Sequence, residues 1–153
     1  SINEPKNPNE FDYKIFLAGS IEMGKATDWQ TEVFEKTDPD LNLVYLNPRR
    51  DKWDSSWVQS IDNPIFKEQV KWELNGLILS DYQIFVFDPL TTSPITLLEL
   101  GLTAPKRNIF GVVCPEGYFR KGNVDIVCEE FYIPVFQNID DLVKEINQAI
   151  SFL

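Results

Sequence analysis

Short apolar runs alternate with helical patterns along most of this chain, and this alternation restricts its fold more than any other feature. Uniformly apolar strands separated by helices are typical of a parallel sheet covered on both faces. The expected strands are residues 14–19, 43–46, 83–87, 108–113 and 133–136, and the expected helices are residues 28–36, 64–79, 94–104, 124–131 and 139–150. Five strands in this alternation predict a doubly wound α/β fold, flavodoxin-like or Rossmann-like, with strand order 2-1-3-4-5 and helices on both faces.

Three of the expected helices begin with a recognisable capping residue. Asn63 precedes Pro64, Ser93 precedes Pro94, and Asn138 precedes the last amphipathic segment. A side-chain oxygen at this position accepts a hydrogen bond from the first turn, and proline is well tolerated at the first helical residue. We therefore expect Ser93 to act as a hydroxyl cap.

The chain has 153 residues, the size of one domain. Residues 1–12 are polar and rich in Asn and Pro, which predicts a flexible leader before a single α/β domain over residues 13–153. No secretory signal is visible, and no apolar run approaches the roughly 20 residues of a bilayer span. Cys114 and Cys128 have no CxxC spacing, and Cys114 is expected to be a small buried hydrophobe. The expected location is the cytoplasm.

The charge and the missing residue types exclude several kinds of function. A net charge of −10 argues against nucleic acid and anionic membranes as partners, because both require clustered Lys and Arg. The chain contains no histidine, which removes Ser-His-Asp catalysis, HExxH zinc sites and imidazole proton shuttles. Acid–base chemistry must then use carboxylates, Lys, Tyr or Cys, and no metal ligand set is expected.

In a doubly wound fold, ligands bind beyond the carboxyl ends of the strands, at the point where the strand order reverses. The residues expected there are Gly19 and Ser20 after the first strand, Asn47 and Arg49 after the second, and Asp88 and Ser93 after the third. The segment 47–63 is longer than most connections and is a candidate lid or binding loop. Its Trp53 and Trp57 could stack on a planar base, or could pack the loop onto the domain.

Glu73 falls near the middle of an apolar stripe on its helix, formed by Phe66, Val70, Leu74 and Leu77. We expect this stripe to face the core. A carboxylate there costs several kcal/mol unless it is paired, hydrogen-bonded or neutral. Glu73 is therefore either part of a buried ion pair or a functional acid.

Glu99 shares a narrow polar strip with Thr92, Thr96 and Thr103 on a helix that is otherwise apolar. This strip either faces water or lines a site. Two acids without histidine suggest chemistry at an anomeric carbon, where one carboxylate captures the carbon and a second acid exchanges a proton with the leaving group. Paired acids are common, so this pattern by itself does not identify a substrate.

Four segments together resemble the nucleoside 2-deoxyribosyltransferase family. They are Phe-Leu-Ala-Gly-Ser-Ile at 16–21, Leu-Asn-Pro-Arg-Arg at 46–50, Trp-Glu-Leu-Asn-Gly-Leu at 72–77 and Ser-Pro-Ile-Thr-Leu-Leu-Glu-Leu-Gly at 93–101. The resemblance runs over most of residues 15–136. It implies exchange of one nucleobase for another on 2′-deoxyribose, with retention of configuration and without a cofactor.

The resemblance also implies roles for particular residues. Glu99 corresponds to the nucleophile, and Glu73 stands where the family has an acid, usually Asp, that handles the proton of the base. Ser93 matches a position near the sugar or its 5′ end. The remaining matches are Gly19 and Ser20 under the sugar, Asn47 and Arg49 near the base, and Asn123 as the candidate residue supplied by a neighbouring subunit. The last match implies a homo-oligomer, at least a dimer, with shared active sites.

Two alternatives remain open at this stage. A related branch of the family hydrolyses deoxynucleoside monophosphates and often has serines where Ser20 and Ser93 stand, so the chain could be an N-glycosidase for deoxynucleosides or their monophosphates. It could also be a catalytically silent nucleotide-binding module, because a fold does not establish a function.

Overall fold

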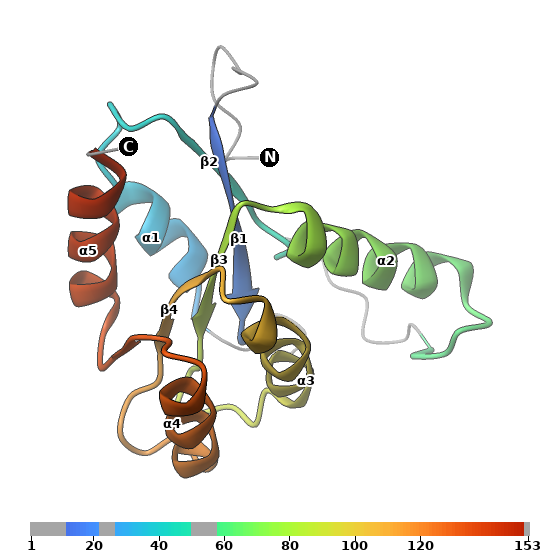
Figure 1. Cartoon of the computed structure of the whole chain (residues 1–153). Helices are drawn as coiled ribbons and strands as arrows, with labels where there is room; N and C mark the ends of the chain where they lie inside the picture. Colours follow the sequence, from blue (N-terminus) through green and yellow to red (C-terminus); the bar gives the residue numbers. More distant parts are fainter. Residues whose placement is uncertain (1–11, 22–26, 50–57, 152–153) are drawn as a thin grey trace.

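The computed structural model describes residues 12–21, 27–49 and 58–151, and contains one five-stranded sheet in the order β2-β1-β3-β4-β5 (Figure 1). All neighbouring strands are parallel, so the predicted strand order and fold class are confirmed. The strands are β1 (Tyr13–Gly19), β2 (Leu43–Leu46), β3 (Tyr82–Val86), β4 (Ile109–Val113) and β5 (Val135–Phe136).

The helices follow the predicted alternation closely. They are α1 (Trp29–Lys36), α2 (Pro64–Leu79), α3 (Pro94–Thr103) with the short 3-10 turn η2 (Ala104–Lys106), α4 (Lys121–Glu130) and α5 (Ile139–Ser151). Among the described residues, no helix has the length and hydropathy that crossing a bilayer requires. The expected leader lies almost wholly outside the described residues.

Two element boundaries differ from the prediction by more than one residue. Helix α4 begins at Lys121 rather than at residue 124, and the Lys121 ammonium contacts Asp125 one turn later at 3.1 Å. Strand β5 begins at Val135 rather than at residue 133, because the backbone N–H of Ile133 donates to the carbonyl of Cys128 at the end of α4. That bond places Ile133 in the turn, where it cannot pair with β4.

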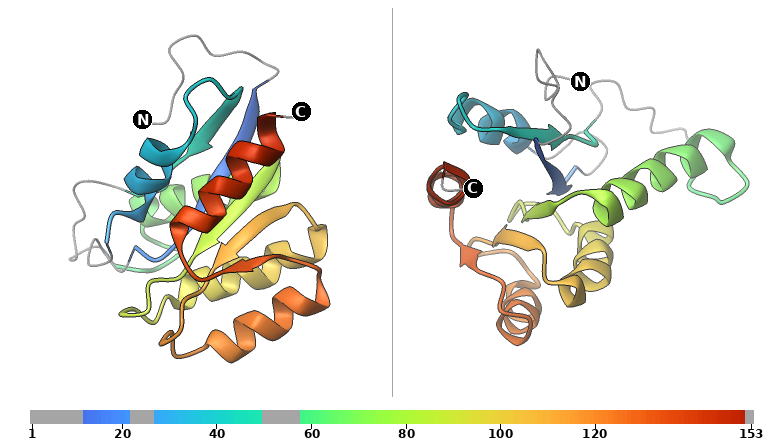
Figure 2. Two further views of the ribbon diagram at one scale, coloured as in Figure 1. Left: turned by 90° about the vertical axis from the view of Figure 1, so that its left-hand side faces the viewer. Right: turned by 45° about the horizontal axis from the view of Figure 1, so that its top comes forward.

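The two faces of the sheet carry separate hydrophobic cores. Ile15 and Leu17 of β1 pack with side chains of α1 and α5, whereas Phe16 and Ala18 pack with side chains of α2, α3 and α4. Successive side chains of a strand point to opposite faces, so one strand serves both cores. Figures 1 and 2 show α1 and α5 on one side of the sheet and the other helices on the opposite side. The first half of α2 projects beyond the sheet in these views.

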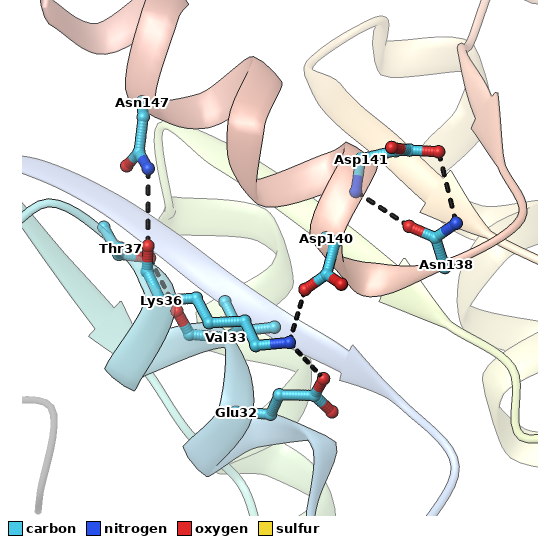
Figure 3. Close-up of polar contacts among 8 residues, drawn as sticks. All are labelled: Glu32, Val33, Lys36, Thr37, Asn138, Asp140, Asp141 and Asn147. Carbon is cyan, nitrogen blue, oxygen red and sulfur yellow. Dashed lines mark hydrogen bonds and ion pairs between the residues drawn. The ribbon is translucent and has the colours of Figure 1, made fainter.

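Polar contacts on the surface join α1 to α5 (Figure 3). The ammonium of Lys36 donates to Glu32 at 2.8 Å and also to Asp140, and the side-chain amide of Asn147 donates to the carbonyl of Lys36 at 3.3 Å. Asn138 accepts from the backbone N–H of Asp141 at 2.8 Å, as its predicted capping role requires. These groups are exposed, so they contribute little stability and mainly fix how the two helices lie together.

The position of α2 depends on a close approach at Gly76. A Cβ added to Gly76 would lie 2.4 Å from a ring carbon of Phe16, whose side chain is buried. Gly101, inside α3, has no atom within 4 Å of the equivalent position. The two helical glycines therefore differ in packing although the sequence presents them alike.

We expect Gly76→Ala to destabilise the fold and Gly101→Ala to stabilise it. Overpacking against Phe16 costs about 1–3 kcal/mol, which exceeds the helix propensity that alanine gains. At Gly101 only that gain of about 1 kcal/mol applies. Urea unfolding followed by circular dichroism measures both changes, and shifts of the same sign in the two variants would contradict the packing at Gly76.

Candidate active site

A pocket of about 530 Å³ lies between α2 and α3 at the carboxyl end of β1. Ala18 and Gly19 contribute from the strand, Glu73 from α2, and Thr96 and Glu99 from α3. This is the edge of the sheet at which the strand order predicts ligand binding. The structure thus brings the two candidate acids to one pocket, although 26 residues separate them in the chain.

Helix α3 turns its polar strip inward. Thr96, Glu99 and Thr103 are buried, with 4%, 9% and 2% of their surface exposed. The apolar side chains of Ile95, Leu98 and Leu102 are instead more than half exposed. Thr92 precedes the helix and is exposed, but for the three residues on α3 the alternative that the strip faces water is wrong. The strip lines the pocket and the interior, and the apolar face of α3 is the one that is uncovered.

The burial of Glu99 changes its ionisation. Removal from water raises the pKa of Glu99 to about 8, and the nearby charge of Glu73 adds to the increase. Glu99 belongs to none of the ion pairs found among the described residues, which involve Lys36 and Lys121. The site therefore holds a carboxyl that keeps its proton to unusually high pH.

Glu73 lies on the wall of the pocket rather than in the core. Of the stripe predicted to face the core, only Leu77 is buried there, whereas Phe66, Val70 and Leu74 are half-buried and line the pocket. The expectation of a wholly core-facing stripe was wrong because the first half of α2 projects beyond the sheet. The side-chain amide of Gln69 donates a hydrogen bond of 3.0 Å to Oε1 of Glu73.

Three hydroxyl groups gather beside the pocket. The Oγ atoms of Ser20 and Ser93 are 2.5 Å apart, and the hydroxyl of Thr91 lies 3.0 Å from the first and 2.7 Å from the second. Ser93 makes no side-chain capping bond, so its predicted role as a hydroxyl cap is wrong. Its backbone is left-handed, with φ of 48°, and its hydroxyl bonds within this cluster instead.

Other predicted site residues converge on Thr27, just before α1. Oδ2 of Asp88 accepts from the backbone N–H and the hydroxyl of Thr27, at 3.3 and 3.2 Å. The guanidinium of Arg49 donates to the carbonyl of Thr27 at 2.8 Å, and Asn47 accepts from the backbone N–H of Arg49 at 2.9 Å. These residues do not line the pocket, and Trp53 and Trp57 lie outside the described residues.

Asn123 lies elsewhere in the molecule. It is exposed on α4 and lines a second hollow of about 310 Å³ between α3 and α4. Within one chain, the structure does not bring it to the pocket that contains Glu99. Its suggested contribution to a neighbouring subunit stays a prediction.

Sequence reasoning missed one polar residue of the pocket that contacts a candidate acid. Gln69 is 8% exposed, lines the pocket and lies one helical turn before Glu73. The spacing of four residues was the available signal, because residues four apart share a helix face. In the part of the chain that the structure describes, no group of three or more Cys, Asp or Glu side chains is arranged to hold a metal ion.

Glu99→Gln should stabilise the protein increasingly as the pH rises. Between the ordinary value of 4.5 and about 8, Glu99 is ionised when unfolded but protonated when folded, so the folded state loses stability through this window. A glutamine has no proton to lose. We expect the variant to gain about 2–4 kcal/mol over the wild type near pH 8. Urea unfolding between pH 5 and 9 measures the free energy of unfolding of both proteins. A constant difference between variant and wild type over this range would contradict the raised pKa of Glu99.

Comparison with known proteins agrees with this fold. The chain superimposes on a crystal structure of a conserved protein from Enterococcus faecalis V583 with a TM-score of 0.61 and 15% identity, covering 90% of this chain and 98% of the other. At that identity the likeness supports the fold alone. No curated protein matches the sequence. A family profile described as nucleoside 2-deoxyribosyltransferase like matches residues 12–118, a span that includes Glu73 and Glu99. The chain therefore belongs to the nucleoside 2-deoxyribosyltransferase-like family.

Proposed function

We propose that this protein transfers the 2-deoxyribosyl group of a deoxynucleoside from one nucleobase to another. The observation that carries the proposal is the convergence of Glu73 and Glu99, from different helices, on one pocket at the switch point of the sheet. Family membership supports a nucleoside as the ligand. The pocket, at about 530 Å³, has the size usual for small-molecule sites.

The first half of the reaction forms a covalent intermediate. A carboxylate oxygen of Glu99 attacks C1′ of the deoxyribose while the C1′–N bond to the base breaks. The bonding electrons stay on the base nitrogen, which takes a proton from Glu73. The products of this step are the free base, ionised Glu73 and a deoxyribosyl ester of Glu99.

The second half reverses these steps with a different base. A nitrogen of the incoming base attacks C1′ and transfers its proton to Glu73, and the ester bond to Glu99 breaks. Two displacements on opposite faces of C1′ retain the configuration. Because the pKa of Glu99 is raised, Glu73 and Glu99 together hold one proton near neutral pH. This proton must reside on Glu73 when Glu99 attacks.

Hydrolysis of deoxynucleoside 5′-monophosphates is a second candidate, and the hydroxyl cluster favours it. Ser93 lines the pocket, and the hydroxyl groups of Ser20 and Thr91 that bond to it are neutral as well, whereas a carboxylate at this place would repel a phosphate. In this reaction water replaces the second base. The two candidates use Glu73 and Glu99 in the same way and differ in the acceptor and in the 5′ substituent.

The uncovered face of α3 supports the proposal that the protein assembles with itself. Ile95, Leu98 and Leu102 line the pocket and are also more than half exposed. A second copy placed over this face would remove apolar surface from water and restrict access of water to the pocket. Such an assembly would be a homo-oligomer whose interface adjoins the active site.

Incubation of the protein with 2′-deoxyinosine and adenine, analysed by chromatography, should yield 2′-deoxyadenosine and hypoxanthine. Glu99→Ala should lower the rate by at least about 10⁴-fold, because among the described residues that line the pocket the other carboxyl is Glu73, which serves as the acid. Glu145→Ala, an exposed acid on α5, is the matched control and should retain full activity.

The same experiment separates the candidates. Hypoxanthine and free deoxyribose without a new nucleoside would indicate hydrolysis, and release of base only from 2′-deoxyinosine 5′-monophosphate would indicate the nucleotide enzyme. Stable binding without release of base from either substrate would indicate a silent binding module. Near-normal turnover by Glu99→Ala would overturn the mechanism.

Leu98→Asp should convert the assembled protein into monomers without loss of fold. A charge at the centre of an apolar interface costs about 2 kcal/mol or more, which raises the dissociation constant at least about 30-fold. Light scattering after size-exclusion chromatography measures the mass. Ile126→Asp, at a 70% exposed position on α4, is the control and should stay assembled. A monomeric wild type would refute the assembly.

A further inference from the structure

Gln69 and Glu73 form a hydrogen-bonded pair on the wall of the pocket. Both project from α2, one helical turn apart, and the Nε2 atom of Gln69 lies 3.0 Å from Oε1 of Glu73. Both line the pocket that Glu99 reaches from α3. The pair therefore belongs to the same site as the reacting carboxylate.

The surroundings of Gln69 give this contact more weight than an exposed pair on a helix would have. Gln69 is 8% exposed, and apolar side chains of α2, Phe66 and Val70, line the pocket beside it. Burying an amide is costly unless it is hydrogen-bonded, and a bond to an ionised acceptor is about twice as strong as one between neutral groups. Because a carboxylate can only accept, the NH₂ group of Gln69 must face Glu73.

We propose that Gln69 is a positioning residue that holds the carboxylate of Glu73 in the orientation needed to exchange a proton with the nucleobase. This inference rests on the proposed function, because it assigns a task to Gln69 only if Glu73 is the acid–base group. Gln69 acts through Glu73 and takes no part in bond making or breaking.

The same hydrogen bond affects where the proton of the acid pair resides. Glu73 and Glu99 are the only ionisable residues among the described residues that line the pocket. By donating to ionised Glu73, Gln69 keeps negative charge on that residue, and this charge adds to the effect of burial on the pKa of Glu99. Loss of the donor should let more of the shared proton reside on Glu73 and lower the pKa of Glu99. This shift by itself favours the form of the acid pair that reacts, so a fall in kcat without the donor reports the lost orientation of Glu73 and not a lost proton.

The principal test is Gln69→Met, which keeps the length of the side chain and removes the donor. We expect kcat to fall about ten- to a hundredfold with KM within about twofold of the wild type, because a misplaced acid–base group slows proton exchange without weakening ground-state binding. Gln148→Met, at an exposed position on α5, is the matched control and should leave both constants unchanged. An unchanged kcat, or a rise in KM alone, would overturn the proposal.

A second variant tests the donor itself. In Gln69→Glu the new carboxyl repels Glu73 when it is ionised and donates an O–H hydrogen bond when it is protonated. Its kcat, relative to that of Gln69→Met at each pH, should therefore recover as the pH falls. Equal pH profiles for the two variants would contradict a donor role and indicate that Gln69 only fills space.

A titration that needs no activity separates failure of this inference from failure of the proposed function. Carboxyl ¹³C NMR follows Glu99, assigned with Glu99→Gln, in the wild type and in Gln69→Met. We expect the pKa of Glu99 to fall from about 8 by at least half a unit in Gln69→Met. Coincident Glu99 titration curves for the wild type and Gln69→Met would overturn the proposal that Gln69 positions Glu73. A wild type without transferase or hydrolase activity would overturn the proposed function whatever the titration shows.

Discussion

The tight contact around Gly19, where β1 ends, determines how the parts of this molecule meet. A Cβ on Gly19 would lie 2.4 Å from the carbonyl oxygen of Val86 and 2.5 Å from the ring of Trp29. The next residue, Ser20, donates its N–H to the same carbonyl and accepts from the indole of Trp29 at 3.0 Å. The ends of β1 and β3 and the start of α1 are thereby locked together. From this junction the chain leaves β1 for α1 on one face of the sheet and β3 for α3 on the other.

The same junction positions the hydroxyl of Ser20 and the start of the helix that carries Glu99. The hydroxyl of Ser20 accepts from the backbone N–H of Asp88 at 2.8 Å and joins the cluster with Ser93, immediately before α3. Helix α3 then carries Glu99 into a buried position whose energetic cost appears as its raised pKa. A fold selected for stability alone would not bury an acid that has no ion pair among the described residues, whereas an acid that must attack carbon gains reactivity from the exclusion of water. Burial of the Glu99 carboxyl therefore lowers the stability of the folded protein at the site where we propose that the reaction occurs.

Much of the architecture could be predicted from local patterns. Asn63 followed by Pro64 marked the start of α2, and the limits of β2 were those expected from its apolar run. The prediction failed where a distant or local backbone contact overrode the pattern, as at Ile133, whose N–H closes α4 instead of extending β5. It failed at Ser93 because a left-handed backbone turns the hydroxyl away from the helix that it precedes. Neither the bond nor the backbone angle has a signature in residue type.

The sequence by itself determined the order of strands and helices and, through the spacing of side chains, which residues share a face of each helix. It also singled out Glu73 and Glu99 as acids in unusual surroundings. Only the tertiary structure decided which face of each helix is covered. It turned the polar strip of α3 inward, and it placed Phe66, Val70 and Leu74 of α2 at the pocket while Leu77 packs in the core. The physical reason is that helical periodicity is a property of neighbouring residues, whereas burial depends on what distant segments pack against them. The pairing of Gln69 with Glu73 could be read from their spacing, but its place opposite Glu99 could not.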